Sequence, residues 1–170
     1  MKRIPLILIA SGIVLMVFII FFENTFPRGF HQLITSSTDL SHENIEGIYV
    51  GDNIKSNKVT KKYEIPTEKS RDVEKYNYYL LRDGVEIATD QAGRISRFII
   101  TDQGLPTAKG IHIGDTKEDV IRKYEKHHYT RSEQGFDIVG YVDKKRKISL
   151  EFWLADGKLE FYRFDEKSMK

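Results

Sequence analysis

The sequence contains no cysteine and a single tryptophan, and its charge is almost balanced. Without cysteine, the chain cannot form a disulfide, a thiolate zinc site, a redox-active thiol or a lipid-modified cysteine anchor. Lysine and arginine number 27 against 25 aspartates and glutamates, and the two counts become equal once Lys2 and Arg3 are set aside. A nucleic-acid-binding surface needs charge of one sign, so this balance argues against a nucleic-acid partner.

Motifs of known catalytic chemistry are also missing. The chain has no Gly-x-Ser-x-Gly nucleophile motif, no His-Glu-x-x-His zinc motif and no glycine-rich phosphate loop. The adjacent pair His127 and His128 is the candidate for acid–base or metal chemistry, with Glu125, Glu133 and Asp137 as nearby carboxylates. Because neighbouring residues on a helix do not face one another, a role at a helix end is the simpler interpretation. We therefore expect no enzyme activity and no cofactor, with a cell-wall or small-molecule hydrolase using His127 and His128 as the alternative.

Charged residues are absent from a run of 19 residues, Ile4 to Phe22. At about 1.5 Å per residue, a helix of this length matches the roughly 30 Å hydrocarbon core of a bilayer. Lys2 and Arg3 precede the run and Glu23 follows it, which by the positive-inside rule places the N-terminus in the cytoplasm. A cleaved signal peptide is the competing interpretation, although its apolar region is normally shorter. We expect an uncleaved signal anchor, and so a single-pass cell-membrane protein with an extracytoplasmic C-terminal domain.

Two stretches of the remaining chain resemble each other: GIYVGDNIKSNKVTKKY from residue 47 and GIHIGDTKEDVIRKY from residue 110. In the second, Gly114 permits a turn and Asp115 is expected to cap a helix. Alternating apolar residues and turn signals after each stretch indicate antiparallel strands. We therefore predict an α+β fold, with an N-terminal transmembrane helix followed by two tandem helix-plus-antiparallel-sheet repeats. The predicted divisions are a cytoplasmic N-terminus (1–3), the transmembrane helix (4–22), a juxtamembrane linker (23–45), a first repeat (46–105), a second repeat (106–165) and a tail (166–170).

A short pattern in the second stretch carries a family resemblance. The pattern is hydrophobic-Gly-x-[Ser/Thr]-x-x-x-Val, present here as Ile113, Gly114, Thr116 and Val120. With the strands that follow, it resembles the tandem modules of the β-lactamase-inhibitor-protein-like superfamily, and especially the CAP-associated N-terminal module of Gram-positive surface proteins. The chain departs from those modules at Glu125, where they usually have glycine. The resemblance implies a binding scaffold on a bacterial surface and no shared catalytic residues.

Aromatic residues gather in several of the expected strands. Leucines and Phe152 fill one side of the strand at residues 147–154, so Trp153 points to the other side, where the first repeat covers it or it lies exposed on a concave sheet. We expect a non-enzymatic protein-binding module, inhibitory or regulatory in role, whose partner is another envelope or membrane protein. A purely structural tethered spacer is a further alternative. The expected partner-binding residues are Tyr76, Tyr78, Trp153 and Tyr162.

Overall fold

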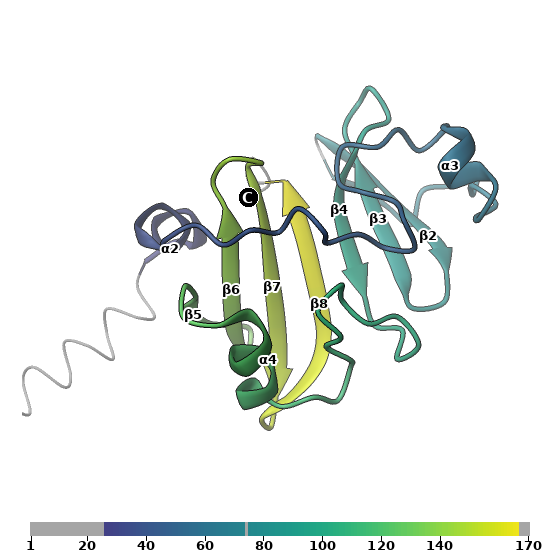
Figure 1. Ribbon diagram of the computed structural model, residues 1–170. Helices are drawn as coiled ribbons and strands as arrows, with labels where there is room; N and C mark the ends of the chain where they lie inside the picture. Colours follow the sequence, from purple (N-terminus) through teal and green to yellow (C-terminus); the bar gives the residue numbers. More distant parts are fainter. Residues whose placement is uncertain (1–25, 74, 167–170) are drawn as a thin grey trace, which may run out of the picture.

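Residues 26–73 and 75–166 are described by the computed structural model, whose arrangement Figure 1 shows. Within these residues the helices are short and the strands make up most of the fold. In chain order the elements are α2 (Arg28–Ile34), α3 (Asn57–Thr60), β1 (Arg71–Val73), β2 (Tyr76–Arg82), β3 (Val85–Thr89), β4 (Ile95–Ile100), α4 (Lys117–Tyr124), β5 (Tyr129–Glu133), β6 (Phe136–Asp143), β7 (Ile148–Ala155) and β8 (Lys158–Glu166).

All the described strands belong to one antiparallel sheet, in the spatial order β1-β2-β3-β4-β8-β7-β6-β5. The meander β1 to β4 joins the meander β5 to β8 where β4 pairs with β8, with Phe98 opposite Phe164 and Ile100 opposite Tyr162. The same core cluster contains these four residues and Ile87 of β3. The predicted fold class of two tandem helix-plus-sheet repeats is therefore wrong, because the described chain forms one continuous sheet over a shared core.

The first of the two similar stretches does not build the helix that a repeat would need. Its helix α3 has four residues, and its N-cap Ser56 makes no side-chain cap hydrogen bond. Asparagine, valine and threonine, which make up most of α3, have low helix propensity. The helix α4 is longer, and it begins one residue later than predicted, with Thr116 as N-cap and Asp119 completing a capping box. Asp115 instead accepts a hydrogen bond from the His112 amide at 2.8 Å.

What the two stretches share is a local turn. Gly51 and Gly114 both have φ in the left-handed region, at +97° and +93°. The Gly51 amide donates to the carbonyl of Ile95 at 2.7 Å, and the Gly114 amide donates to the carbonyl of Leu159 at 2.8 Å. Each turn therefore fastens the chain to the start of a central strand, β4 in one case and β8 in the other. This attachment accounts for the recurrent glycine and aspartate without a repeated domain.

No helix among residues 26–73 and 75–166 is long and apolar enough to cross a membrane. The predicted transmembrane helix at residues 4–22 lies outside the described residues. The transmembrane, single-pass and signal-anchor assignments are corrected accordingly, since the described structure gives them no support.

The two faces of the sheet differ in chemistry. The core face is apolar and is covered by α3, α4 and the segment after α2, which crosses the front of the sheet in Figure 1. Leu40, Val59 and Tyr124 are among the covering residues buried in the core. We call the opposite face the arginine face. Its strand residues include Arg97 of β4, Arg131 of β5, Glu151 and Trp153 of β7, and Arg163 and Asp165 of β8.

Candidate functional site

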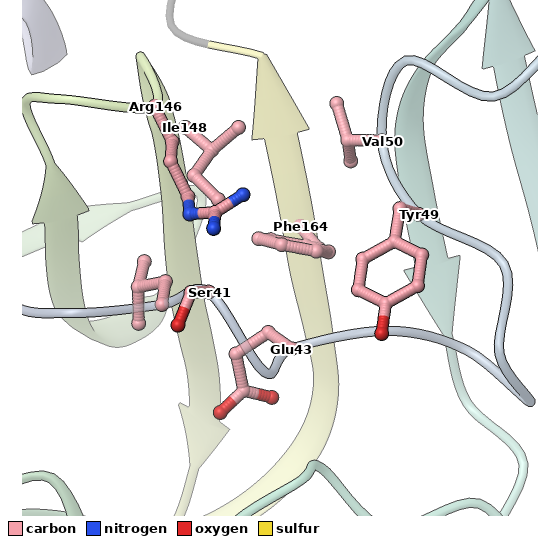
Figure 2. Close-up of a pocket in the computed structure, with 8 residues that line it drawn as sticks. Ser41, Glu43, Tyr49, Val50, Arg146, Ile148 and Phe164 are labelled. Carbon is pink, nitrogen blue, oxygen red and sulfur yellow. The ribbon is translucent and has the colours of Figure 1, made fainter.

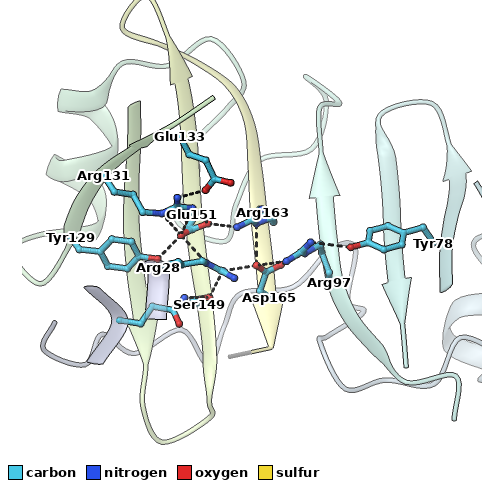
Figure 3. A network of polar contacts seen from close by, with 11 residues as sticks. Arg28, Tyr78, Arg97, Tyr129, Arg131, Glu133, Ser149, Glu151, Arg163 and Asp165 are labelled. Atoms are coloured by element: carbon cyan, nitrogen blue, oxygen red, sulfur yellow. Dashed lines mark hydrogen bonds and ion pairs between the residues drawn. The ribbon is translucent and has the colours of Figure 1, made fainter. Parts of the chain in front are cut away.

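The arginine face holds an ion-pair cluster built around two carboxylates, Glu151 and Asp165, whose residues are both fully buried. Strand pairing brings the partners together, because Glu151 lies opposite Arg163 and Asp165 lies opposite Arg97. Figure 3 shows the cluster extending across β7, β8 and β4. Such a cluster links strands that are far apart in the sequence. Its arginines are Arg28, Arg97, Arg131 and Arg163.

Glu151 is the acceptor on which most of these donors converge. Its oxygens accept from the Tyr129 hydroxyl at 2.6 Å, from Arg163 Nη2 at 2.6 Å and from Arg28 Nε at 2.9 Å. Arg131 adds contacts at 3.2 Å. Burial acts to raise the pKa of this carboxyl group, but the neighbouring arginines and the Tyr129 hydroxyl outweigh burial and lower it to about 2. Glu151 is therefore ionised throughout the physiological pH range.

Asp165 joins the meander β1 to β4 to the same cluster. Arg97 donates to it through Nε at 2.6 Å and Nη2 at 3.1 Å, a bidentate geometry that fixes the guanidinium plane. Arg28 reaches its Oδ2 at 2.5 Å and so bridges the two buried carboxylates. Burial acts to lower the pKa of Arg28, but the negative charges of Asp165 and Glu151 outweigh burial and raise this pKa above the usual arginine value.

Arg28 also fixes α2 against the sheet. It is the first residue of α2, and its Nη2 donates to the Ser149 hydroxyl at 2.9 Å in addition to the two carboxylates. Gln32 donates to the same hydroxyl at 3.2 Å, and the His31 ring stacks on Tyr129 with centroids 5.8 Å apart. The segment predicted as a juxtamembrane linker (23–45) has apolar residues at helical spacing, Phe26, Phe30, Leu33 and Ile34, and it contains a helix docked on the arginine face. Sequence reasoning missed this contact because Arg28 is more than a hundred residues from its partners.

Gly140 gives Tyr129 room to reach Glu151. Tyr129 lies opposite Gly140, and Gly140 lies opposite Glu151, on adjacent strands. A Cβ atom added at Gly140 would lie 2.1 Å from the Cζ atom of Tyr129. The tyrosine ring therefore lies across the glycine and places its hydroxyl on the carboxylate. Glycine at this position serves close packing of a side chain against the strand.

Trp153 lies on the arginine face, as the alternation predicted, and is 3% exposed. It stacks on Phe161 with ring centroids 5.0 Å apart and meets the edge of Phe136 at 5.8 Å. The guanidinium groups of Arg163 and Arg131 lie 4.8 Å and 5.3 Å from its ring centroid. Its cover thus comes from neighbouring strands of the same meander and not from residues 46–105.

The other expected partner-binding residues divide between the two faces. Tyr76 and Tyr78 lie on the arginine face with Trp153, whereas Tyr162 lies on the core face and is 1% exposed. Tyr78 is buried, and its hydroxyl accepts from Arg97 Nη1 at 3.0 Å. The Arg71 guanidinium lies over its ring at 4.4 Å. The structure therefore brings three of the four expected residues to one face.

Exposed apolar side chains lie beside Tyr78 at the edge of the sheet. Val73 of β1 is 49% exposed and Leu80 of β2 is 51% exposed. Strand alternation places Leu80 on the same face as Tyr78, and pairing places Val73 opposite Tyr76. Tyr76 and Ile99 are partly buried and pack against the small cluster of Tyr78 and Ala88. We call the surface of Val73, Tyr76 and Leu80 the β1–β2 patch.

A pocket of about 300 Å³ opens on the other side of the sheet, beside Phe164 (Figure 2). Glu43 lines it and is 5% exposed. Its carboxylate accepts from the Tyr124 hydroxyl at 2.6 Å and from the Ala108 amide at 3.0 Å. Burial raises the pKa of Glu43 despite these two hydrogen bonds. The lining residues are Leu40, Ser41, Glu43, Tyr49, Val50, Arg146, Ile148 and Phe164.

The two histidines considered for catalysis do not meet the carboxylates considered with them. His127 is exposed, and His128 Nδ1 lies 3.3 Å from the backbone carbonyl of Glu125. The Glu133 carboxylate pairs with Arg131, and Asp137 accepts from the Ser132 hydroxyl at 3.2 Å. In the described part of the chain, no group of three or more His, Asp or Glu side chains is placed to hold a metal ion.

Comparisons with known proteins add little. No protein-family model and no curated protein matches the sequence. Among solved structures, the chain is similar to an extracellular protein containing an SCP domain from Bacillus anthracis str. Ames, at 11% identity and a TM-score of 0.49. The match covers 77% of this chain, which spans less than half of that protein, 46% of its length. None of this tests the resemblance to the CAP-associated N-terminal module, which stays a prediction.

Proposed function

We propose that this chain is a non-enzymatic protein-binding module that acts outside the cytoplasm and docks a protein partner on the β1–β2 patch. The observation that carries the proposal is the exposure of two apolar side chains, Val73 and Leu80, which lie on the same face of the edge strands, one on either side of Tyr78. A single exposed apolar residue is ordinary, but a grouped set on a rigid surface is typical of an interaction site. Elsewhere on this face, ion pairs and aromatic stacking cover the side chains, as at Glu151 and Trp153.

The patch has the composition and rigidity of a docking surface. Tyrosine and arginine are the residue types that carry much of the energy in protein interfaces. Here the Tyr78 hydroxyl accepts a hydrogen bond from Arg97, and the Arg71 guanidinium lies over the Tyr78 ring. Arg71 and Lys75 are exposed at the edge of the patch. Because Arg71 already pairs with Glu86 at 2.5 Å, the apolar side chains and not the charges carry the proposed recognition.

The proposed location rests on the sequence. The uncharged apolar run at residues 4–22 favours export, and a fold without cysteine needs no disulfide in an oxidising compartment. On this proposal the partner is another protein of the cell envelope, and the chain is a relative of the small surface modules that it resembles.

Site-specific crosslinking in the cells that produce the protein tests the proposal. A photoreactive residue at position 76 is expected to give a discrete adduct with one envelope protein. The same residue at position 122, on the exposed side of α4, is the control and should give none. The substitution Leu80→Asp should abolish the adduct from position 76 with little effect on stability, because Leu80 is half exposed.

The identified partner should then bind the purified protein, and Leu80→Asp should weaken that binding by tenfold or more, about 1.4 kcal/mol. Equal adducts from positions 76 and 122, or an adduct that persists with Leu80→Asp, would contradict the patch as the docking surface. If position 76 gives no adduct at all, the binding function itself is refuted at this face.

A further inference from the structure

The pocket beside Phe164 carries opposite charges at its two ends. In Figure 2 the Glu43 carboxylate lies at one end and the Arg146 guanidinium at the other, with Phe164 and Tyr49 along one side. Its volume of about 300 Å³ is at the lower limit of small-molecule pockets. At about 30 Å³ per water molecule, the pocket has room for roughly ten waters. It therefore suits a ligand of a few heavy atoms with charge at both ends.

At the Glu43 end, Lys109 and His42 act on the carboxylate through their charges but do not bond to it. Its hydrogen-bond donors, the Tyr124 hydroxyl and the Ala108 amide, are neutral. No ion pair to Glu43 forms among residues 26–73 and 75–166, and the nearby ammonium of Lys109 lies over the Tyr124 ring at 4.8 Å. A carboxylate has about four lone-pair positions, so this one can accept further donors. A ligand ammonium group would supply both the missing charge and the donors.

The Arg146 end can receive an anion. Its side chain is 52% exposed, and its ion pair with Asp143 is long, at 3.9 Å. A guanidinium presents five N–H donors in a planar fork that matches a carboxylate. The Ser41 hydroxyl lines the pocket between the two charged groups. The remaining wall is apolar and comes from Leu40, Val50, Ile148 and Phe164.

We propose that this pocket binds a free amino acid, a small zwitterion that carries both an ammonium group and a carboxylate. The ammonium group lies at Glu43, the carboxylate lies at Arg146 and the side chain packs against Phe164. The site is on the opposite face of the sheet from the β1–β2 patch, so it does not depend on the docking proposal. A simple anion is disfavoured by Glu43, and a simple amine leaves Arg146 with only its long ion pair to Asp143.

Ligand titrations of the full chain, followed by calorimetry or by perturbation of Phe164 resonances, test this assignment. The probes are leucine, N-acetylleucine, which has no ammonium group, and leucinamide, which has no carboxylate. Leucine is expected to bind at least about tenfold more tightly than either blocked compound. The substitution Arg146→Gln, at an exposed side chain, should bring leucine down to the affinity of leucinamide. Arg122→Gln on α4 is the matched control and should leave all three affinities unchanged.

The substitution Glu43→Gln is a second test, because it should make the affinities of leucine and N-acetylleucine equal. If that variant fails to fold, the comparison of the three probes on the unmodified chain still decides the question. The proposal is overturned if leucine fails to saturate the protein at millimolar concentrations, or if N-acetylleucine binds as tightly as leucine. It is also overturned if Arg122→Gln and Arg146→Gln have equal effects.

Discussion

At the scale of single residues, Glu151 holds a position that few other residue types could fill. Its carboxylate accepts from Arg28, Arg131, Arg163 and Tyr129 at once, with no exposure to solvent. Burying such a group costs several kcal/mol of desolvation, which is offset only when its partners are well placed. The partners come from α2, β5 and β8, so the carboxylate fixes how these elements meet. Its contribution is as much to specificity of packing as to stability.

Replacement of Glu151 by glutamine should therefore be costly. The variant leaves Arg28, Arg131 and Arg163 buried with less compensating charge, and breaking a buried pair from one side typically costs about 3–5 kcal/mol. Chemical denaturation should show a fall of this size in the free energy of unfolding. Glu133→Gln is the control, because Glu133 pairs with the same Arg131 but is 42% exposed, and it should cost less than about 1 kcal/mol. Similar losses in both variants would contradict a special role for the buried carboxylate.

The lowered pKa of Glu151 predicts an acid-sensitive stability. In the unfolded chain this carboxyl group has its ordinary pKa of 4.5, and in the folded protein its pKa is about 2. Above pH 4.5 both states are ionised and the stabilisation is complete. As the pH falls from 4.5 towards 2, the unfolded chain takes up a proton that the folded protein excludes, so the free energy of unfolding falls. Thermal unfolding across this range should show the loss, and Glu151→Gln should lack that part of it. A pH profile identical in the two proteins would refute the assignment.

At the scale of the elements, the sequence predicted the strands whose apolar residues alternate. Alternation predicts a strand at residues 147–154, and the Asp156-Gly157 pair, a two-residue hairpin signal, predicts a turn to a second strand. Strands β7 and β8 lie at these positions. The edge strands β1 and β5 were missed. Their residues, RDV and YTRSE, are mostly polar, and each strand pairs with a neighbouring strand on one side only. Polar residues on an edge strand resemble those of a loop, so alternation gives no signal there.

The ion-pair cluster could not be predicted from the sequence, for a related reason. Arg28, Arg97, Arg131 and Arg163 each look like solvated surface charges, since arginine is mostly exposed in proteins. A signal existed in β7, where Glu151 stands between Leu150 and Phe152 and two residues before the one tryptophan. A charged residue within such an apolar strand indicates a buried partner of opposite charge. It does not indicate which of the distant arginines that partner is.

The capping box of α4 offers a test at this scale. The Thr116 hydroxyl accepts from the Asp119 amide at 3.2 Å, and the Asp119 carboxylate accepts from the Thr116 amide at 3.1 Å. Thr116→Ala removes the first of these bonds and should destabilise the protein by about 1 kcal/mol in denaturant titrations. Thr101→Ala, at an exposed position outside any helix, should change stability by less than about 0.5 kcal/mol. Equal effects of the two substitutions would show that the cap contributes nothing.

At the scale of the whole molecule, the pairing of β4 with β8 predicts one cooperative unfolding transition. Ile87 of β3 and Phe152 of β7 belong to the same core cluster, so a substitution that destabilises the packing of one meander also destabilises the other. Ile87→Ala should lower stability by about 2–5 kcal/mol. It should shift the midpoint measured by Trp153 fluorescence, on β7, as far as the midpoint measured by far-ultraviolet circular dichroism. If the fluorescence midpoint stays in place while the dichroism midpoint moves, the two meanders unfold separately.

The place of β8 in the sheet sets the order in which the molecule can assemble. It is the last of the described strands along the chain, yet it lies in the interior of the sheet, between β4 and β7. While the chain is being synthesised, β4 and β7 each present an unpaired edge until residues 158–166 have emerged. The sheet can therefore be completed only after β8 has emerged, even if the strands within each meander have already paired. A chain stalled before residue 158 is therefore the species most exposed to edge-to-edge aggregation.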